Sequence, residues 1–509
     1  MKSLMDHPIP LRAWFLLLTL PINSSNPVFK MTTPKNRGEQ GFAGSEGVVV
    51  WKNKQGTQLK SALTRLSHFQ VVFELHPLDA TFRFSDRLDG LRIKIHRKPV
   101  FIGTAIVTHV INSGKGLVCT ADLTGKWLYH QVTLPIRPEE VRGSFDGFVQ
   151  LWQRNYHISS EFKKVVADMK SFLDEFRLWL EQVESGLRTQ PSIPGHNHEQ
   201  ELDHLMGPCV APYLTALFEK FENAAKAVPE QHQPAHRSYC RKELLPLLLN
   251  SPFMNRIYTK PLGFAGDFEM VKMILRPDPY EGPSLFARML NGFILGAPPA
   301  VAHRNRVEWL TRRLVEETNR VSQYQRRARI LNIGCGPAGE VQAFLRDHPL
   351  ADQAELHLLD FSADALADTA ATLEEICDKY GRHTSIKCQL KDVHDLQGES
   401  GTRLVEGKFD LIYCAGLFDY LQDDLCEKIV AHFYKLIQPG GLVVVTNVDT
   451  YNPIKNIMEF LYEWHLVYRT GAQLASLAPS GIPPDSFRVS AEPTSTNIFL
   501  EIRKPKESS

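Results

Sequence analysis

The stretch that decides the fold is Arg329-Ile-Leu-Asn-Ile-Gly-Cys-Gly-Pro-Ala-Gly339, which leads directly into residues 340–347. Its first five residues form a short, mostly apolar run that predicts a buried strand, and residues 340–347 predict the start of a helix. Between them, Gly334, Gly336 and Gly339 predict a tight turn, because glycine tolerates left-handed backbone and lets a ligand approach closely. This glycine spacing serves several nucleotide cofactors, and it also occurs in turns that bind nothing.

Strands and helices alternate from this stretch to the end of the chain. Further strands are predicted at 355–359, 386–390, 409–414, 442–446, 487–490 and 497–502, and helices at 365–379 and 421–436. Such alternation is typical of βαβ units, in which a parallel sheet is covered by helices on both faces. We therefore predict an α/β domain at 325–509 with a seven-stranded Rossmann-like sheet, preceded by a helical region and a small N-terminal β-barrel.

Acidic residues follow the second and third predicted strands. Asp360 comes directly after residues 355–359, where a carboxylate can accept hydrogen bonds from both hydroxyls of a ribose. Its alternative role is to cap the next helix, although Ser362 is well placed to do that. Asp392 closes the third strand, where a carboxylate or a backbone group can reach an adenine amino group. The alternative for Asp392 is a loop carboxylate without a ligand.

The fifth predicted strand is introduced by Pro439-Gly-Gly441, which predicts a sharp turn. The ordered series of glycine loop, Asp360, Asp392, Phe409-Asp410 and this turn resembles the class I S-adenosylmethionine (SAM)-dependent methyltransferases over residues 325–505. The resemblance implies SAM as the cofactor, since an NAD-linked dehydrogenase need not contain the last turn.

One position departs from that family. Asn332 stands two residues before Gly334, where many class I enzymes have Asp or Glu. Recognition of the methionine end of SAM is therefore expected to fall to other groups. The predicted cofactor-binding residues are Asn332, Gly334, Gly336, Ala338, Asp360, Phe361, Asp392, Val393 and Ala415.

Two polar and aromatic segments outside these motifs are candidates for the acceptor site. Residues 255–267 precede the cofactor domain and predict a lid, and we assign lid and cap helices to 251–324. The alternative is a helix-capping turn in which Asp267 is the N-cap. Trp464-His-Leu-Val-Tyr-Arg469 predicts an aromatic and basic helix face whose arginine could clamp an anionic acceptor. The alternative is an amphipathic helix packed on the sheet.

Five segments together indicate one family more specifically. They are Tyr258 to Met270, Ala302-His-Arg-Asn-Arg306, Asn332 to Ala338, Leu417-Phe-Asp-Tyr-Leu421 and Trp464 to Thr470. Over residues 230–505 this series resembles bacterial proteins of extracellular-factor 3-hydroxypalmitic acid methyl ester biosynthesis. The resemblance implies a carboxyl O-methyltransferase whose small-molecule acceptor is a hydroxy fatty acid.

A carboxylate acceptor is already ionised at pH 7, so catalysis would need positioning and desolvation but no general base. The residues predicted to orient the acceptor or close the lid are Tyr258, Lys260, Asp419, Tyr420 and Arg469. If the acceptor were a hydroxyl or an amine, Asp419, Tyr420 or His465 would have to take a proton. The sequence leaves two other functions open: an NAD-linked oxidoreductase, and a non-catalytic regulator whose barrel senses a ligand.

The N-terminal half carries a different pattern. Short β-branched runs separated by Gly, Asp and Pro predict a small β-barrel at 46–137. The barrel is similar to a PilZ-type domain, but the ligand signature of that family is not evident, since Arg65 lacks its partner arginine. We therefore expect the barrel to serve in docking or in a homodimer. Residues 138–250 follow helical spacing and predict a helical linker domain.

Residues 1–45 are expected to be disordered or to include a wrongly assigned start. Residues 1–25 resemble a weak signal peptide, because Lys2 and Arg12 precede a short apolar run. The interpretation that we favour is a start codon assigned too early, since a polar stretch begins at Met31.

Composition excludes several classes of protein. The 509 residues include 58 Lys and Arg against 57 Asp and Glu, so a nucleic-acid-binding protein is not indicated. The eight cysteines form no C-x-x-C pair, so we predict no metal site and expect reduced thiols in the cytoplasm. No run reaches the roughly 20 apolar residues of a membrane span, so no stable membrane insertion is expected.

Overall fold

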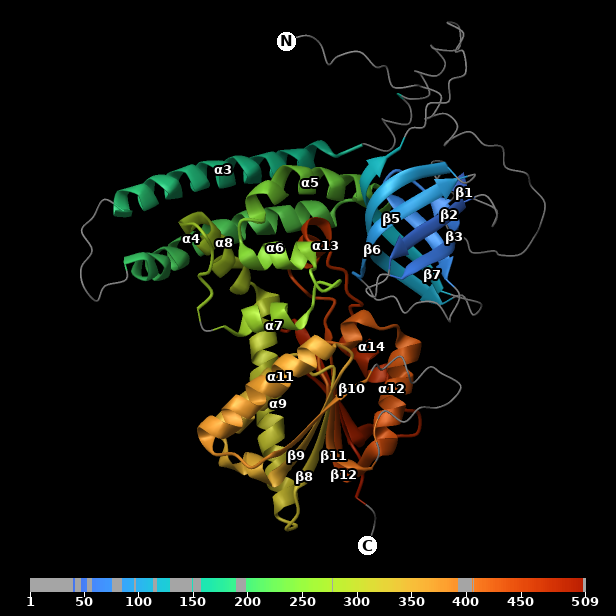
Figure 1. The fold of residues 1–509 in the computed structure, drawn as a ribbon, viewed down its shortest axis with the longest axis vertical. Helices are drawn as coiled ribbons and strands as arrows, with labels where there is room; N and C mark the ends of the chain where they lie inside the picture. The colour runs from blue at the N-terminus through green and yellow to red at the C-terminus, as the bar shows by residue number, and fades with distance from the viewer. Residues whose placement is uncertain are drawn as a thin grey trace, which may run out of the picture. The chain divides into compact units, whose positions relative to one another are not determined.

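The computed structural model describes residues 40–41, 47–52, 57–75, 85–95, 98–112, 117–128, 149, 157–188, 198–276, 278–391, 405 and 407–506. The chain divides into two compact units, and Figure 1 shows the fold with its elements labelled. The N-terminal unit comprises Met1–Asp168 and Asn223–Leu244, and the C-terminal unit comprises Met169–Glu222 and Leu245–Ser509.

The N-terminal unit contains a closed antiparallel barrel of six strands, which confirms the predicted barrel. The strands are β2 (Gly47–Lys52), β3 (Gln58–Leu66), β4 (Gln70–Leu75), β5 (Arg87–Ile95), β6 (Lys98–Asn112) and β7 (Leu117–Trp127). They pair in the order β3-β2-β5-β6-β7-β4, and β4 pairs back to β3; the short β1 (Gln40–Gly41) adds to β3. Trp51, Phe73 and Phe101 fill the interior and are almost completely buried.

Three helices follow the barrel in sequence: α3 (Ser160–Arg188), α4 (His198–Lys226) and α5 (Gln233–Leu248). The short η1 (Glu230–His232) leads into α5. Within the N-terminal unit, α5 is joined to the barrel by a buried ion pair in which Arg237 Nη1 lies 3.1 Å from Asp122 Oδ2. This pair fixes the start of α5 against strand β7.

The C-terminal unit is built on a seven-stranded sheet, as predicted. Its strands are β8 (Ala328–Ile333), β9 (Ala354–Asp360), β10 (Ser385–Leu390), β11 (Phe409–Cys414), β12 (Ile437–Val448), β13 (Phe487–Ala491) and β14 (Asn497–Arg503). Their order is β10-β9-β8-β11-β12-β14-β13, with the first five parallel and β14 antiparallel to both neighbours. The carboxyl ends of the five parallel strands therefore meet at one edge, where α/β sheets bind ligands.

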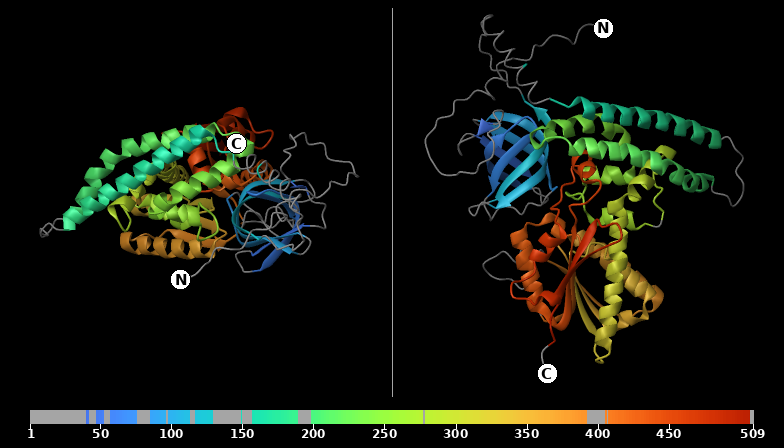
Figure 2. Two further views of the ribbon diagram at one scale, coloured as in Figure 1. Left: turned by 90° about the horizontal axis from the view of Figure 1, so that it is seen from above. Right: turned by 180° about the vertical axis from the view of Figure 1, so that it is seen from behind.

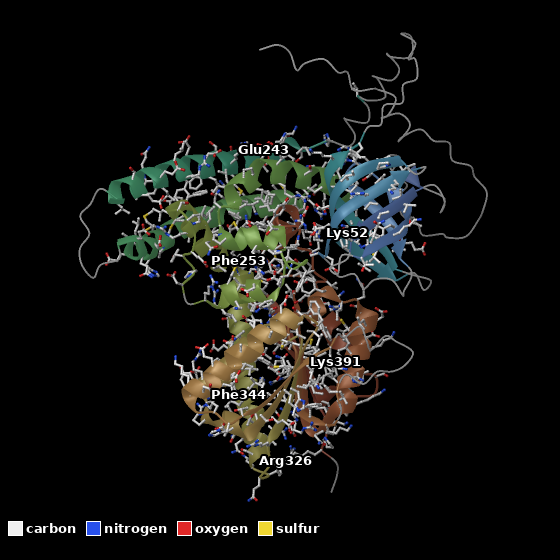
Figure 3. All side chains as sticks on the ribbon, viewed as in Figure 1. Lys52, Glu243, Phe253, Arg326, Phe344 and Lys391 are labelled. Carbon is white, nitrogen blue, oxygen red and sulfur yellow. The ribbon has the colours of Figure 1, made fainter. Side chains whose placement is uncertain are left out.

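Helices cover both faces of this sheet (Figures 1 and 2). One face packs against α9 (Pro298–Ser322), α10 (Gly339–Asp347) and α11 (Ala363–Tyr380), and the other against α12 (Asp423–Leu436) and α14 (Gly471–Ser476). Phe344 of α10 and Phe433 of α12 are completely buried, one on each face (Phe344 is marked in Figure 3). The two cores together hold the strand ends in place.

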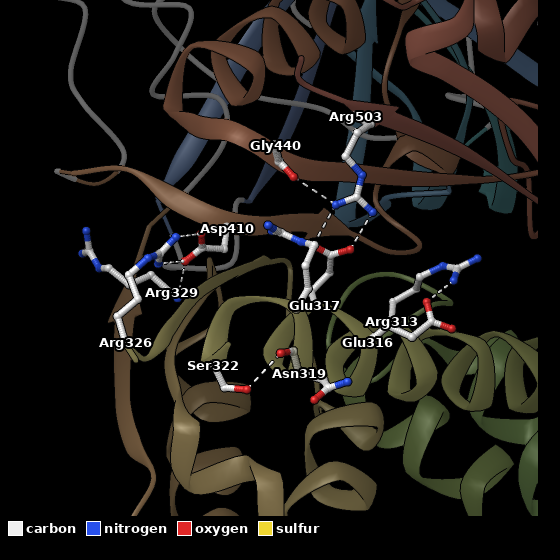
Figure 4. A network of polar contacts seen from close by, with 11 residues as sticks. Arg313, Glu316, Glu317, Asn319, Ser322, Arg326, Arg329, Asp410, Gly440 and Arg503 are labelled. Atoms are coloured by element: carbon white, nitrogen blue, oxygen red, sulfur yellow. Dashed lines mark hydrogen bonds and ion pairs between the residues drawn. The ribbon is translucent and has the colours of Figure 1, made fainter. Parts of the chain in front are cut away.

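The Pro-Gly-Gly segment was predicted as a turn before the fifth strand, and that prediction is wrong in detail. Residues 439–441 lie inside β12, where the register with β11 shifts between Phe409 and Leu411. Gly440 has a φ of +75°, and its carbonyl accepts a hydrogen bond from Arg503 Nη1 at 3.1 Å. Arg503 also pairs with Glu317 of α9, so this irregular strand segment helps to fix α9 on the sheet (Figure 4).

The C-terminal unit contains seven further helices or short 3-10 helices among the described residues. They are α6 (Pro252–Thr259), α7 (Phe268–Leu275), α8 (Leu285–Leu295), α13 (Lys455–Leu461), η2 (Pro349–Gln353), η4 (Phe418–Tyr420) and η5 (Pro484–Ser486). Residues 464–469, which were predicted as a helix face, form no helix. This segment is instead an irregular stretch of chain that is hydrogen-bonded to β12, since Arg469 N–H donates to Val448 O.

In the part of the chain that the structure describes, no single helix has the length and hydropathy of a membrane span, whereas α8 and α9, bent by 57° at their junction, meet that test together.

Candidate active site

The glycine loop between β8 and α10 has the tight, left-handed course that its sequence predicts. Gly334, Gly336 and Ala338 have φ values of +68°, +50° and +49°. The loop is tied to the second strand of the domain, because the N–H groups of Gly334 and Cys335 both donate to Leu359 O at 2.8 and 3.0 Å. A Cβ built on Gly336 meets no atom within 4 Å, so the loop borders open space on that side among the described residues.

Asp360 stands at the carboxyl end of β9 and binds to the glycine loop. Its Oδ2 accepts a hydrogen bond from Gly336 N–H, and its Oδ1 accepts one from Ser362 N–H, both at 2.9 Å. Each carboxylate oxygen can accept more than one hydrogen bond, so these two bonds do not by themselves exclude a ribose hydroxyl. Ser362 takes the capping role, as its hydroxyl accepts from Ala365 N–H at the start of α11.

Asn332 is buried beside the loop, and its side chain is hydrogen-bonded to Glu340, which was not among the predicted site residues. Asn332 Nδ2 donates to Glu340 Oε1 at 3.0 Å, and Tyr413 Oη donates to the same oxygen at 2.8 Å. Burial raises the pKa of Glu340 above its usual value, against the opposing effect of these donors. A carboxyl group thus lies beside Asn332, and it comes from the first turn of α10 and not from the strand.

Asp419 and Tyr420 lie in η4, directly after the carboxyl end of β11. Asp419 Oδ1 accepts from Val448 N–H at 2.6 Å, and its carbonyl accepts from Val467 N–H at 2.7 Å. Burial raises the pKa of Asp419, and it raises the pKa of Tyr420 well above 10. Tyr420 Oη accepts a hydrogen bond from Trp464 Nε1 at 3.0 Å, so its own proton remains available to donate elsewhere.

The segment that was predicted as a lid contacts both the cofactor motifs and η4. The ring of Phe264 lies 5.8 Å from that of Phe361 and 6.5 Å from that of Tyr420. A Cβ built on Gly266 would lie 2.3 Å from Tyr420 Oη, so only glycine allows this approach. Asp267 caps α7 by accepting from Met270 N–H, which is the alternative role considered for it.

Lys260 and Arg469, which were predicted to orient the acceptor, are instead held by internal hydrogen bonds. Lys260 Nζ donates to the carbonyls of Tyr462 and Glu463 at 3.2 and 3.0 Å, and its side chain is 2% exposed. Arg469 is equally buried and donates to Phe418 O and to four further groups, on Leu421, Asp423, Cys426 and Asn447. Both side chains therefore fix the backbone around the site and do not face an open space.

The structure describes two of the remaining predicted residues and does not describe two others. Tyr258 on α6 and Ala415 after β11 are half-buried. Asp392 and Val393 lie outside the described residues, which end at Lys391 on this side of the gap (Figure 3). No cluster of three or more metal-binding side chains occurs among the residues that are described.

A largely apolar cavity of about 680 Å³ lies in the C-terminal unit close to the glycine loop. Its walls come from α4, α7, α8, the start of α9 and residues 453–457. Leu275 lines the cavity, and a Cβ built on Gly339 would lie 2.6 Å from Leu275 Cδ1. One leucine side chain therefore separates the cavity from the end of the glycine loop.

Comparison with known proteins agrees with this site. Residues 331–443, from β8 to β12, match the family described as "Methyltransferase domain". No curated protein sequence matches the chain.

Solved structures with similarity to the chain include methyltransferases. A possible exported protein from Bordetella parapertussis is 15% identical with a TM-score of 0.35, covering 68% of this chain and 96% of its own. Magnesium protoporphyrin IX methyltransferase from Synechocystis, with S-adenosylhomocysteine bound, is 13% identical with a TM-score of 0.30, covering 42% and 87%. The N-methyltransferase NodS from Bradyrhizobium japonicum, also with that product bound, is 15% identical with a TM-score of 0.29, covering 49% and 100%.

The family match and the geometry of the strand ends lead to one conclusion. The C-terminal domain is a SAM-dependent methyltransferase domain, which replaces the alternative of an NAD-linked oxidoreductase. The open side of Gly336 and the carboxylate of Asp360 fit the adenosine half of that cofactor.

Proposed function

We propose that this chain is a SAM-dependent O-methyltransferase acting on the carboxylate of an elongated apolar acid, of which a hydroxy fatty acid is the expected type. The observation that carries the proposal is the apolar cavity beside the glycine loop, with a cationic side chain on its wall. Its volume of about 680 Å³ lies within the roughly 300–1,000 Å³ that small-molecule sites occupy.

The lining of the cavity suits an apolar chain with an anionic head. Phe218, Phe293 and Ile454 contribute large apolar side chains. Arg304 also lines the cavity, and its guanidinium donates only to the carbonyls of Ile274 and Leu295, at 3.2 and 2.9 Å. Within the described part of the chain Arg304 forms no ion pair. Glu219 and Glu222 also line the cavity, and the carboxylate of Glu222 accepts hydrogen bonds from Asn456 and from Ile457 N–H.

The protein groups near the strand ends suit a nucleophile that needs no base. When bound, the cofactor supplies an electrophilic methyl group on a sulfonium, and an ionised carboxylate can accept that methyl without losing a proton. Because burial raises the pKa of Tyr420 well above 10, its hydroxyl acts as a hydrogen-bond donor and not as a base at pH 7. We assign to Tyr420 the role of orienting the acceptor, and to the 258–267 segment that of excluding water.

The proposal is tested by incubating the purified full-length chain with methyl-labelled SAM and a panel of long-chain acids with and without a hydroxyl at carbon three. The expected product is an alkali-labile methyl ester, identified by mass spectrometry. Thr215 is exposed and lines the cavity, so Thr215→Trp should fill it without disturbing the core and raise the KM for the acid roughly tenfold.

A matched control is available on the same helix. Ala216 is exposed and lies next to Thr215 but outside the cavity lining, so Ala216→Trp should leave the KM unchanged. Formation of a methyl ether instead of an ester, or equal effects of the two tryptophans, would contradict the proposal.

A further inference from the structure

Arg306 is a buried cation whose hydrogen bonding leaves its charge without a counterion. It lies on α9 with 7% of its surface exposed, and it forms no ion pair with any residue that the structure describes. Its Nη2 instead lies 3.1 Å from each ring nitrogen of His303, one turn earlier on the helix. Burial and the adjacent arginines lower the pKa of His303 well below 6.5, so this neighbour is neutral. Buried charges in proteins are normally paired, so Arg306 is unusual.

The guanidinium of Arg306 lies beside Gly416, just after the carboxyl end of β11. A Cβ built on Gly416 would lie 3.1 Å from Arg306 Nη1 and 3.2 Å from Nη2. Gly416 follows the carboxyl end of β11, and the next residue, Leu417, is the nearest neighbour of Gly334 in the glycine loop. The positive charge therefore lies at the end of β11, next to the segment that contacts the glycine loop.

A buried negative charge lies nearby and is not paired with Arg306. Glu340 is 6% exposed, and Asn332 and Tyr413 both donate to its Oε1. Glu340 and Asp419 are close enough to favour the charged form of Arg306, yet neither forms an ion pair with it. Oδ1 of Asp419 accepts a hydrogen bond from Val448 N–H and not from Arg306. The site therefore contains a buried guanidinium and a buried carboxyl group that influence each other electrostatically but form no ion pair within the described residues.

We propose that Arg306 and Glu340 together form the receptor for the α-amino-acid end of the cofactor, with Arg306 binding its carboxylate and Glu340 its ammonium group. A zwitterion placed between the two charges gives each a partner, and charge-assisted hydrogen bonds then offset the burial of both. Many class I enzymes have an acidic residue at the position of Asn332, and in this chain Glu340 takes over its role. Asn332 holds Glu340 in position by donating a hydrogen bond to its Oε1. The inference rests on the SAM-dependent domain and is independent of the acceptor.

The test compares two ligands that share the adenosine half. S-Adenosylhomocysteine carries the amino-acid group, whereas methylthioadenosine lacks it. Calorimetric titration of the full-length chain should show that Arg306→Met lowers the affinity for S-adenosylhomocysteine roughly ten- to hundred-fold. The affinity for methylthioadenosine should stay unchanged. Glu340→Gln should act in the same direction, and Arg306→Lys should recover part of the affinity because it keeps the charge.

Arg312→Met is the matched control, since Arg312 is exposed on the same helix and should alter neither titration. If Arg306→Met fails to fold, the same comparison is made with Arg306→Lys and Glu340→Gln, which preserve charge or shape.

Three results would overturn the proposal, and they are distinguishable. Equal weakening of both ligands would mean that Arg306 only supports the fold. Unchanged binding of both, with a raised KM for the acceptor acid, would mean that Arg306 receives the acceptor's carboxylate. Failure of the unaltered chain to bind either ligand would remove the cofactor itself, and with it this receptor.

Discussion

The backbone N–H of Gly336 donates a hydrogen bond to Asp360 Oδ2 over 2.9 Å, and this bond joins the glycine loop to the end of the second strand of the domain. The loop is also held by Leu359 O, which accepts from Gly334 N–H and Cys335 N–H. The carboxylate that we assign to the ribose therefore also shapes the loop beside it. The glycine loop and the end of β9 thus position each other through the protein's own hydrogen bonds.

Asp360→Asn should weaken binding of S-adenosylhomocysteine roughly ten- to hundred-fold. The amide oxygen can still accept a hydrogen bond from one backbone N–H. The substitution removes the negative charge and one of the two acceptor oxygens, and hydrogen bonds to charged groups are the stronger ones. Calorimetric titration measures the effect. Asp364 is exposed in the first turn of α11, so Asp364→Asn serves as the control and should bind normally. Equal affinities for the two variants would refute the ribose role of Asp360.

Much of the C-terminal fold could be predicted because parallel strands that are buried on both faces have continuous apolar sequences. Every residue of β11 from Phe409 to Cys414 is buried, and this strand was predicted with its observed bounds. Strand β3 of the barrel is harder to locate from sequence, because only some positions of Gln58–Leu66 are buried and several of its residues also favour helices. Its pairing with β2 and β4 determines its structure, and that information is not local.

The charged residues of the site were harder to predict than its strands. Arg469 was selected because an arginine can bind an anionic acceptor, but a buried arginine that binds carbonyls has the same local sequence. Arg306 and Glu340 were not selected as site residues, although Glu340 directly follows Gly339 of the glycine motif. Their proximity arises because α9 packs across the strand ends, which no spacing within the motif reveals.

Arg469→Lys should lower the free energy of unfolding by about 2–3 kcal/mol. The arginine donates to Phe418 O, Leu421 O and Asn447 Oδ1 at 2.5–2.8 Å, and a lysine cannot reproduce this planar fork. Denaturant unfolding followed by circular dichroism measures the loss. Among the residues that the structure describes, the Arg346 side chain pairs only with its exposed neighbour Asp347, so Arg346→Lys should change stability by less than about 0.5 kcal/mol. A fully stable Arg469→Lys variant would show that this network does not hold η4.

The pKa of Glu340 makes the stability of the protein depend on pH in a defined direction. Burial raises this pKa, so the folded carboxyl keeps its proton at pH values where the unfolded one, with a pKa near 4.5, has lost it. The stabilisation from Glu340 is therefore complete below about pH 4.5 and is lost as the pH rises through the folded pKa. We expect the stability of the unaltered protein relative to Glu340→Gln to be greater at pH 4 than at pH 7.

Denaturant unfolding of both proteins at these two pH values provides the measurement for Glu340. Each unit by which the folded pKa exceeds the unfolded one corresponds to about 1.4 kcal/mol. A difference that did not change with pH would mean that the carboxyl is not desolvated. A difference that grew toward pH 7 would mean that the attraction of Arg306 outweighs the effect of burial.

Tyr420→Phe should lower kcat for a carboxylate acceptor roughly tenfold while leaving the affinity for S-adenosylhomocysteine unchanged. The hydroxyl accepts from Trp464 Nε1, and its own proton is the group that we assign to the acceptor. Because burial raises the pKa of Tyr420 well above 10, its hydroxyl stays protonated through the neutral range. A tyrosine acting as a base would make the rate rise with pH as it loses its proton. The rate of the unaltered enzyme should show no such rise between pH 7 and 9. Steady-state kinetics across that range distinguishes the two roles, since loss of activity in Tyr420→Phe accompanied by loss of a basic limb would identify Tyr420 as a base.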